Sequence, residues 1–308
     1  MTKLSKDFPH FFLLQKNFSL LQRARFVLQK KLFLLHIFFT SLFSVFWEKD
    51  VFLWKIYKTG NMAKLIEEFQ FCVESFHLDC TEHLSLSTLG NQMLNAAVRH
   101  AEPLGFGHKK LNDLGVTWVF SRLLIQMERY PREFDKYAIR TWIPSVSRYF
   151  TNRNFIIQDA EGSPIGYATS VWAMIDLTTR QPVDITKLVP EYASAVVPPE
   201  EQPQCPVART NRVRVTAEEP VYTFAPQFFD IDYNGHLNSI RTIEHFLNAL
   251  PAEELREHPV HRMEVAYSAE GKYHEPLSIY LSTGAEGEYA MEMRKADGTI
   301  ACHCKVLL

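Results

Sequence analysis

Three polar side chains alternate along the segment DIDYNGHLN, immediately before an apolar repeat of helical period. Asp232, Asn234 and His236 are separated by single residues, so a turn that presents alternate side chains would gather an acid, an amide and an imidazole. The helix predicted from Asn238 onward would offer its N-terminal N–H groups to developing negative charge. Such donors suit the oxyanion of a tetrahedral intermediate, as in acyl transfer. The alternative is structural, because Asp and Asn also favour turns and helix caps.

The elements that must position these groups are one helix and the strands that follow it. Apolar residues recur at helical spacing from Asn238 to Leu250, and Pro251 is expected to stop the helix. The strands follow as MEVAYS, LSIYLST, YAMEMRK and TIACHCKVLL, with Asp297 and Gly298 in a hairpin turn between the last two. One helix against four or five antiparallel strands predicts an α+β unit whose sheet wraps the helix.

This unit occurs twice in the chain. LDCTEHLSLSTLGNQMLNAA at 78–97 aligns with IDYNGHLNSIRTIEHFLNAL at 231–250 at an offset of 153, and AEGS at 160–163 resembles ADGT at 296–299. Two landmarks in the same order favour a duplication over chance similarity. The first copy carries Asp79, Thr81 and His83, so its turn persists while a hydroxyl replaces the amide. This difference favours the second copy as the unit that performs the chemistry.

Composition divides the chain into four segments. We predict a hydrophobic, basic extension at 1–61, an N-terminal unit at 62–185, a linker at 186–210 around the proline-rich VPPEEQPQCP, and a C-terminal unit at 211–308. The extension has ten Lys and Arg against three Asp and Glu, and eleven of the 23 phenylalanines. The whole chain has a net charge of −2, so the remainder is acidic.

The extension contains one apolar run, LFLLHIFFTSLFSVFW at 32–47. This run is short for a membrane span, which needs roughly 20 residues. We favour a misassigned start, with Met62 opening the working protein; a membrane anchor and a targeting peptide are the alternatives. We therefore expect a cytoplasmic protein, associated with a membrane only if the run at 32–47 is a genuine anchor.

The composition of the 308 residues, 46% hydrophobic and 22% charged, excludes disordered, collagen-like and disulfide-scaffold classes. The five cysteines form no CxxC motif, which favours a reducing compartment. Neither metal-ligand spacing nor a glycine-rich phosphate loop is present in the sequence. We expect no cofactor, no metal and no nucleic-acid partner.

Five segments resemble one enzyme family in their family order. They are GFG at 105–107, TWVFSR at 117–122, RYP at 129–131, SVWAMIDLTTRQP at 170–182 and FDIDYNGHLNSIRTIEH at 229–245. From about Glu67 to Leu308 the chain resembles the acyl-acyl carrier protein thioesterases, bacterial members more than plant plastid ones. The family fold is a double hotdog, with two tandem units that each wrap an antiparallel sheet around a central helix.

The resemblance implies that Asp232, Asn234 and His236 are catalytic, together with a glutamate on the strand packed against the helix. Glu270 matches that glutamate. It would act as a general base on water or attack the thioester carbonyl to form a transient anhydride. In plant members a cysteine follows the glutamate, whereas this chain has Gly271, so a Cys–His mechanism is unavailable at that position. Cys302 and Cys304 are expected to be ordinary residues of the last strand.

In the family the first unit shapes the acyl pocket. Apolar residues of that unit are therefore candidates for contacting the acyl chain: Met93, Phe120, Leu124 and Trp172. Residues of these types are also common in ordinary cores.

The implied partner is an acyl carrier protein that bears a fatty acyl chain. Because carrier proteins are acidic, a basic cluster should receive them. Arg209, Arg212 and Arg214 are the main candidates, whereas Lys109 and Lys110 are expected to be a solvated surface. The expected reaction is hydrolysis of fatty acyl-acyl carrier protein, which ends chain elongation. An acyl-coenzyme A thioesterase and a non-catalytic acyl-binding module are the alternatives, and a monomer and a homodimer both stay open.

Overall fold

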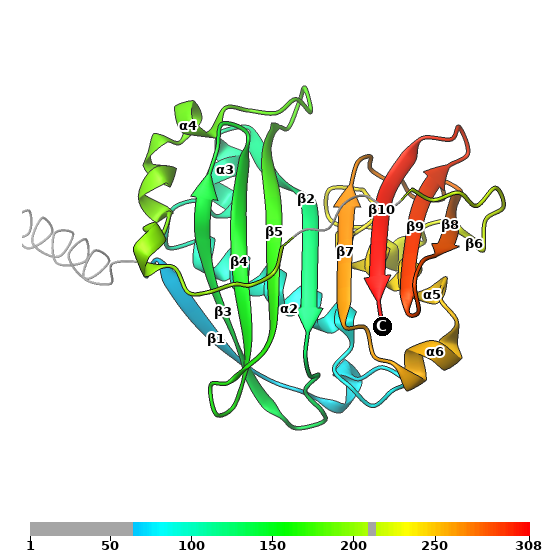
Figure 1. Ribbon diagram of the computed structural model, residues 1–308. Coiled ribbons are helices and arrows are strands. Elements are labelled where there is room, and N and C mark those ends of the chain that lie inside the picture. Colours follow the sequence, from blue (N-terminus) through cyan, green and yellow to red (C-terminus); the bar gives the residue numbers. More distant parts are fainter. Residues whose placement is uncertain (1–63, 209–213) are drawn as a thin grey trace, which may run out of the picture. The chain divides into compact units, whose positions relative to one another are not determined.

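The computed structural model describes residues 64–208 and 214–308 (Figure 1). The predicted extension at 1–61, with its apolar run at 32–47, lies outside the described residues, as do Arg209 and Arg212. Within the described residues, every helix is too short or too polar to span a bilayer.

Two units of similar layout follow one another along the chain. The first contains β1 (Ile66–Cys72), η1 (Ser75–His77), α2 (Leu86–Ala101), α3 (His108–Asp113), β2 (Val116–Met127), β3 (Lys136–Val146), β4 (Phe150–Asp159) and β5 (Pro164–Asp176). The second contains β6 (Tyr222–Phe224), η4 (Phe228–Asp230), α5 (Ser239–Asn248), α6 (Ala252–Glu257), β7 (Arg262–Tyr267), β8 (Leu277–Thr283), β9 (Glu288–Lys295) and β10 (Ile300–Leu307). The four strands predicted after the second helix are therefore present.

The ten strands of the described residues form one antiparallel sheet in the order β1-β3-β4-β5-β2-β7-β10-β9-β8-β6. Each unit contributes five strands, and the order of the second unit mirrors that of the first. The units are joined where β2 pairs with β7, between Arg122 and Ala266 at one end and Gln126 and Arg262 at the other. This double hotdog arrangement confirms the predicted α+β fold.

The long helices α2 and α5 lie on the same face of the sheet (Figure 1), and residues of both belong to one hydrophobic core. Their contact depends on a glycine, since a Cβ on Gly90 of α2 would lie 2.9 Å from Cδ1 of Ile240 on α5. A larger residue at this position would require the Ile240 side chain to move, because packed cores leave little free volume.

The duplication extends to individual hydrogen bonds. Ser85 caps α2 and Asn238 caps α5, and these two positions are separated by the predicted offset of 153. The same offset relates Glu82 and Gly235, which both adopt positive φ, 62° and 83°. The two turns therefore share one backbone conformation.

The segment between the units is more ordered than its proline content suggests. It forms α4 (Ile185–Leu188), η2 (Pro190–Ala195) and η3 (Pro199–Glu201). Val189, Tyr192 and Ala195 are buried against Phe106 and other residues of the first unit. The first part of the predicted linker thus packs as part of that unit. Two further short helices, α3 and α6, were not predicted.

Candidate active site

The turn before α5 is organised by the carboxylate of Asp232. Its Oδ1 accepts hydrogen bonds from the backbone N–H of Asn234 at 2.8 Å and from that of His236 at 3.2 Å. The N–H of Asp232 donates to the carbonyl of His236 at 2.8 Å, which closes the loop. The Asn234 side chain is exposed and His236 is partly buried. Asp232 therefore shapes the backbone that carries the amide and the imidazole.

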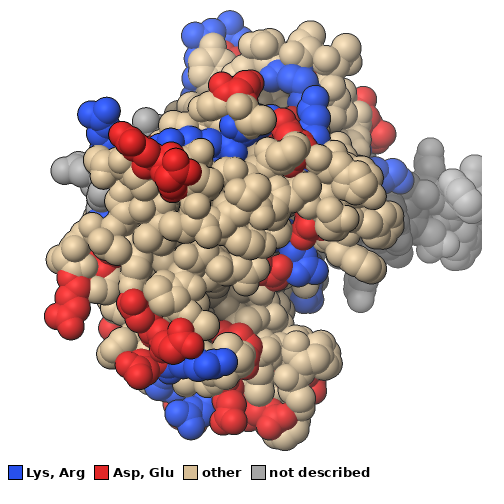
Figure 2. All heavy atoms as spheres, turned by 90° about the vertical axis from the view of Figure 1, so that its right-hand side faces the viewer, with Lys and Arg blue, Asp and Glu red and all other residues tan. Residues whose placement is uncertain are grey.

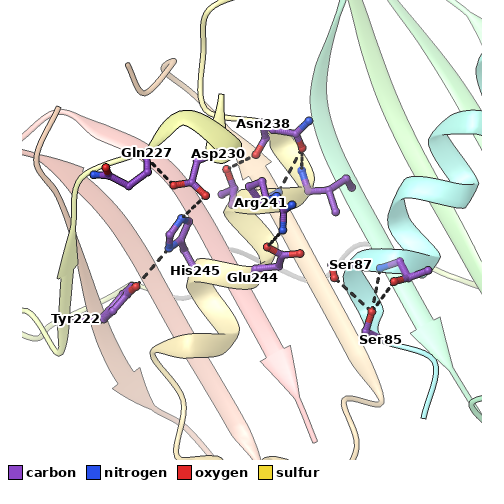
Figure 3. A network of polar contacts seen from close by, with 12 residues as sticks. Ser85, Ser87, Tyr222, Gln227, Asp230, Asn238, Arg241, Glu244 and His245 are labelled. Carbon is purple, nitrogen blue, oxygen red and sulfur yellow. Dashed lines mark hydrogen bonds and ion pairs between the residues drawn. The ribbon is translucent and has the colours of Figure 1, made fainter. Parts of the chain in front are cut away.

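The N-terminus of α5 is closed by its own cap (Figure 3). Asn238 Oδ1 accepts from the N–H groups of Ile240 at 2.8 Å and Arg241 at 3.3 Å. These donors are therefore occupied, and the expectation that they bind an oxyanion is wrong for Ile240 and Arg241. The Asn234 carboxamide is the better candidate donor.

A second polar contact anchors the turn from behind, also visible in Figure 3. Asp230 accepts from the N–H of Gln227 at 2.7 Å, and its other oxygen lies 3.5 Å from Nε2 of His245 on α5. The carbonyl of Asp230 accepts from the N–H of Asn238 at 2.8 Å. The helix start and the turn are thereby fixed to one another.

Glu270 meets this turn from the loop that follows β7. It lies three residues beyond Tyr267, the last residue of β7, so its expected place on the strand is wrong. The loop pairs with the turn through the N–H of Leu237, which donates to the Gly271 carbonyl at 2.8 Å. This pairing brings Glu270 Oε2 to 3.0 Å from His236 Nε2. The Glu270 side chain is 44% exposed.

The second oxygen of Glu270 pairs with a residue that the sequence analysis missed. Arg180, which follows β5 in the first unit, donates from its guanidinium to Glu270 Oε1. Its backbone φ is +58°, a left-handed conformation uncommon for a non-glycine residue. Arg180 falls inside the family-like stretch 170–182, and that stretch was the available signal.

The first unit holds the same turn without a counterpart of the Glu270 carboxylate. Asp79 Oδ1 accepts from the Thr81 hydroxyl at 2.5 Å, and that hydroxyl lies 3.0 Å from Nδ1 of His83. Leu84 N–H donates to the Pro131 carbonyl at 2.9 Å, as Leu237 does to that of Gly271. Tyr130 consequently occupies the position of Glu270.

The phenol of Tyr130 is not available for chemistry. It donates to the Val260 carbonyl at 2.7 Å, and burial raises the pKa of Tyr130 far above its usual value. The first unit therefore offers no counterpart of the Glu270 carboxylate.

A pocket of about 660 Å³ opens over the second turn, within the usual range for small-molecule sites. Asp232, Asn234, His236, Glu270 and Arg180 all line it, as do apolar residues of the first unit. The site thus combines the polar turn and Glu270 of the second unit with Arg180 and an apolar wall from the first.

Two of the four acyl-pocket candidates line this pocket and two do not. Phe120 and Trp172 line the pocket, and their ring centroids are 4.6 Å apart. Met93 is 1% exposed and packs in the core beneath α2. Leu124 is buried between Leu123 and Ile125, which face that core, so strand alternation directs Leu124 to the opposite face. Neither Met93 nor Leu124 is among the residues that line the pocket.

The cysteines do not provide a nucleophile. At Gly271 an added Cβ would lie 3.1 Å from Leu277 Cδ1 and 3.2 Å from Leu237 Cβ, which leaves little room for a side chain. Cys302 lines the pocket, but burial raises the pKa of its thiol to about 12. The thiolate is the reactive form, so this thiol is inert near neutral pH.

The basic cluster is only partly described. Arg214 is exposed and is absent from the residues that line the pocket. Of the two lysines, Lys110 pairs with Glu191 at 3.3 Å. On the face seen in Figure 2, acidic and basic side chains are interspersed.

Among the side chains that the structure describes, no three His, Cys, Asp or Glu residues are grouped so that they could hold a metal ion.

Comparisons with known proteins agree with this arrangement. The acyl-ACP thioesterase N-terminal domain matches residues 65–192, and the acyl-ACP thioesterase C-terminal domain matches residues 214–306. A crystal structure of an acyl-ACP thioesterase from Bacteroides thetaiotaomicron superposes with a TM-score of 0.73 and 39% identity, covering 79% of this chain and 97% of that one.

More distant relatives come from plants. The chain is 24% identical to the chloroplastic oleoyl-acyl carrier protein thioesterase 2 of Arabidopsis thaliana over 75% of this chain. The match spans 66% of that relative's length, slightly less than two thirds. A 12:0-ACP thioesterase from Umbellularia californica shares the fold, with a TM-score of 0.67 at 19% identity over 80% of this chain and 98% of that one. Two matched domains in order and the bacterial structure lead to one conclusion: the chain belongs to the acyl-ACP thioesterase family.

Proposed function

We propose that this protein hydrolyses the thioester between a fatty acyl chain and acyl carrier protein, releasing free fatty acid and ending chain elongation. The observation that carries the proposal is the 3.0 Å contact between Glu270 Oε2 and His236 Nε2, two residues that line the 660 Å³ pocket. Apolar side chains of the first unit would contact the acyl chain, and the thioester would lie over the turn of the second unit.

Glu270 is the group that drives hydrolysis in this proposal. As a general base it takes a proton from water, the water oxygen attacks the carbonyl carbon, and the C–S bond breaks to release the thiol. As a nucleophile it attacks the carbonyl itself, expels the thiolate and leaves an anhydride; water then cleaves the anhydride to the acid, regenerates the Glu270 carboxylate and supplies the proton that the thiolate takes up. The exposed side chain of Glu270 gives water access in either route.

The other polar groups position the reactants. His236 orients the Glu270 carboxylate through their contact, and the Asn234 carboxamide would donate to the developing oxyanion. Asp232 acts through the backbone, because its carboxylate binds the N–H groups of both residues. Asp232 is therefore a positioning residue in this proposal.

The partner is an acidic carrier protein, and we place its docking at Arg209, Arg212 and Arg214. The support is charge complementarity alone, since opposite charges steer association. Replacing all three arginines with glutamine should raise KM for carrier-bound substrate while leaving hydrolysis of a small acyl thioester unchanged. An equal effect on both substrates would contradict this docking site.

The experiment that tests the function measures acyl release by the full chain on a panel of acyl-carrier-protein chain lengths, with the matching coenzyme A thioesters alongside. Faster release from the carrier form is expected. Faster release from coenzyme A would identify an acyl-coenzyme A thioesterase, and binding without release on any chain would identify an acyl-binding module.

A further inference from the structure

Arg153 on β4 is a cation buried without an acidic partner. The residue is 5% exposed, and its NH1 donates to His100 Nδ1 at 2.8 Å and to the Thr141 hydroxyl at 3.3 Å. Within residues 64–208 and 214–308, neither Asp nor Glu pairs with it, and its remaining guanidinium N–H groups make no hydrogen bond. A buried charge without compensation is costly.

The neighbours of Arg153 do not supply a negative charge. His100 accepts from Arg153 at Nδ1, and its Nε2 lies 2.8 Å from the carbonyl of Lys64, which requires a neutral ring with its proton on Nε2. Burial, with Arg153 as the second cause, lowers the pKa of His100 to about 4. Burial also raises the pKa of Tyr192, whose hydroxyl donates to Thr151 Oγ1 at 3.1 Å. Both neighbours are therefore uncharged near neutral pH.

Arg153 lines a smaller cavity that adjoins the catalytic pocket. This cavity has a volume of about 110 Å³ and is also lined by Thr151, Tyr192 and Phe106. It shares part of its wall with the larger pocket: Val98, Thr117, Trp118, Trp172 and Tyr233. Because Arg153, Thr151 and Tyr192 line the smaller cavity alone, they lie beyond the shared wall as seen from Glu270. An acyl chain that extended from the larger pocket between the shared residues would bring its distal part beside this polar group.

We propose that Arg153 is a specificity-determining residue that hydrogen-bonds an oxygen carried by the acyl chain, so that the preferred substrates are acyl thioesters with a hydroxyl, oxo or carboxyl group away from the thioester. This inference rests on the proposed function. A plain hydrocarbon chain would cover the free N–H groups and leave them without water or a partner. Sites built to bond a substrate oxygen discriminate strongly against the analogue that lacks it.

The test uses the full chain and carrier-bound acyl chains of one length, unsubstituted or bearing a hydroxyl, oxo or carboxyl group at successive positions. At one position or more, kcat/KM for the oxygenated chain should exceed that of the plain chain by about tenfold or more, as expected for a hydrogen bond to a charged group. Arg153→Met should bring this ratio close to one, and Arg153→Lys should restore part of it. Which group gives the largest ratio distinguishes a hydroxyl, an oxo and a carboxyl ligand.

A matched control separates recognition from structural support. Thr141→Val removes one hydrogen bond of Arg153 but changes no residue that lines either cavity. It should lower the melting temperature and keep the substrate ratio. If Arg153→Met destabilises the fold and leaves the ratio unchanged, Arg153 is structural and the inference fails.

A binding measurement covers the case in which Arg153→Met does not fold. The melting temperature of the unaltered protein should rise more with hydroxy or dicarboxylic fatty acids than with the plain acid of the same length. Equal shifts for every acid would overturn the inference. Release of plain chains with no preference for oxygenated ones would refute this inference alone, whereas no release from any chain would refute the proposed function with it.

Discussion

The guanidinium of Arg180 pairs with the carboxylate of Glu270, although the two residues are 90 positions apart and belong to different units. The carboxylate is thus held between Arg180 on one side and His236, at 3.0 Å, on the other. The duplicated sheet brings these groups together where the end of β5 faces the loop after β7. The site requires both halves of the fold.

Arg180 should be a positioning residue for Glu270. Arg180→Gln frees one carboxylate oxygen and lets the side chain leave His236, so kcat should fall about tenfold to a hundredfold with little change in KM. Arg180→Lys should restore part of kcat, because it keeps the charge and loses the fork geometry.

Arg129→Gln provides the control for Arg180, since Arg129 forms an exposed ion pair with Asp159 at 2.7 Å outside the residues that line the pocket. Steady-state kinetics of the three variants would decide the matter. A loss in Arg129→Gln equal to that in Arg180→Gln would show that the effect is unrelated to Glu270.

The buried thiol of Cys302 should not take part in the reaction. Because burial raises its pKa to about 12, the thiol stays protonated at pH 8 and resists alkylation. Iodoacetamide should modify the exposed Cys80 first and leave hydrolysis intact, and Cys302→Ala should retain activity. Inactivation that follows modification of Cys302, mapped by mass spectrometry, would argue against this account.

The buried His100 should make stability depend on pH. Its folded-state pKa of about 4 lies below the unfolded value of about 6.5, so between these values the unfolded chain binds more protons. Stability from this group is fully present above pH 6.5 and is lost as the pH falls toward 4.

A variant that does not titrate isolates this effect. The amide of His100→Gln can accept from Arg153 and donate to the Lys64 carbonyl at every pH. Thermal unfolding from pH 7 to 4 should therefore show a steeper decline for the unaltered protein than for His100→Gln. Parallel curves would contradict the assignment of a neutral, buried ring.

The cap of α2 should contribute to stability without affecting chemistry. Ser85 accepts from the N–H of Thr88 at 3.2 Å, so Ser85→Ala should cost about 1 kcal/mol of unfolding free energy. Ser85→Asn should cost little, since Asn238 serves as the cap at the equivalent position of α5. Urea unfolding measures both, and equal losses in the two variants would show that the cap is not the cause.

Local patterns predicted the second unit well. The turn from Asp232 to His236, the helix expected from Asn238 and the four strands that follow all depend on short-range spacing, and the structure contains them close to the expected residues. The duplication was also visible, because one offset relates the two turns.

Contacts between distant segments were harder to predict. Arg180 reaches Glu270 only because the strands of the two units join at β2 and β7 into one sheet. The sequence did not reveal that Tyr130 is the counterpart of Glu270, because the segments between the turn and the loop differ in length in the two units. Leu124 and Met93 are apolar because they are buried in the protein. Residue type alone does not distinguish such a position from one that contacts the acyl chain.

The most direct test of the proposed catalytic site compares substitutions of His236 and His83, which are equivalent in the two units, with a substitution of Glu270, which contacts His236. Acyl release from carrier protein should fall at least about a hundredfold in His236→Ala and in Glu270→Gln, the range expected for loss of a general base or its partner. In His83→Ala, which alters the matching turn of the first unit, release should stay within about threefold of the unaltered protein. If Glu270→Gln kept its full rate, or if His83→Ala lost as much activity as His236→Ala, the assignment of catalysis to the second unit would be wrong.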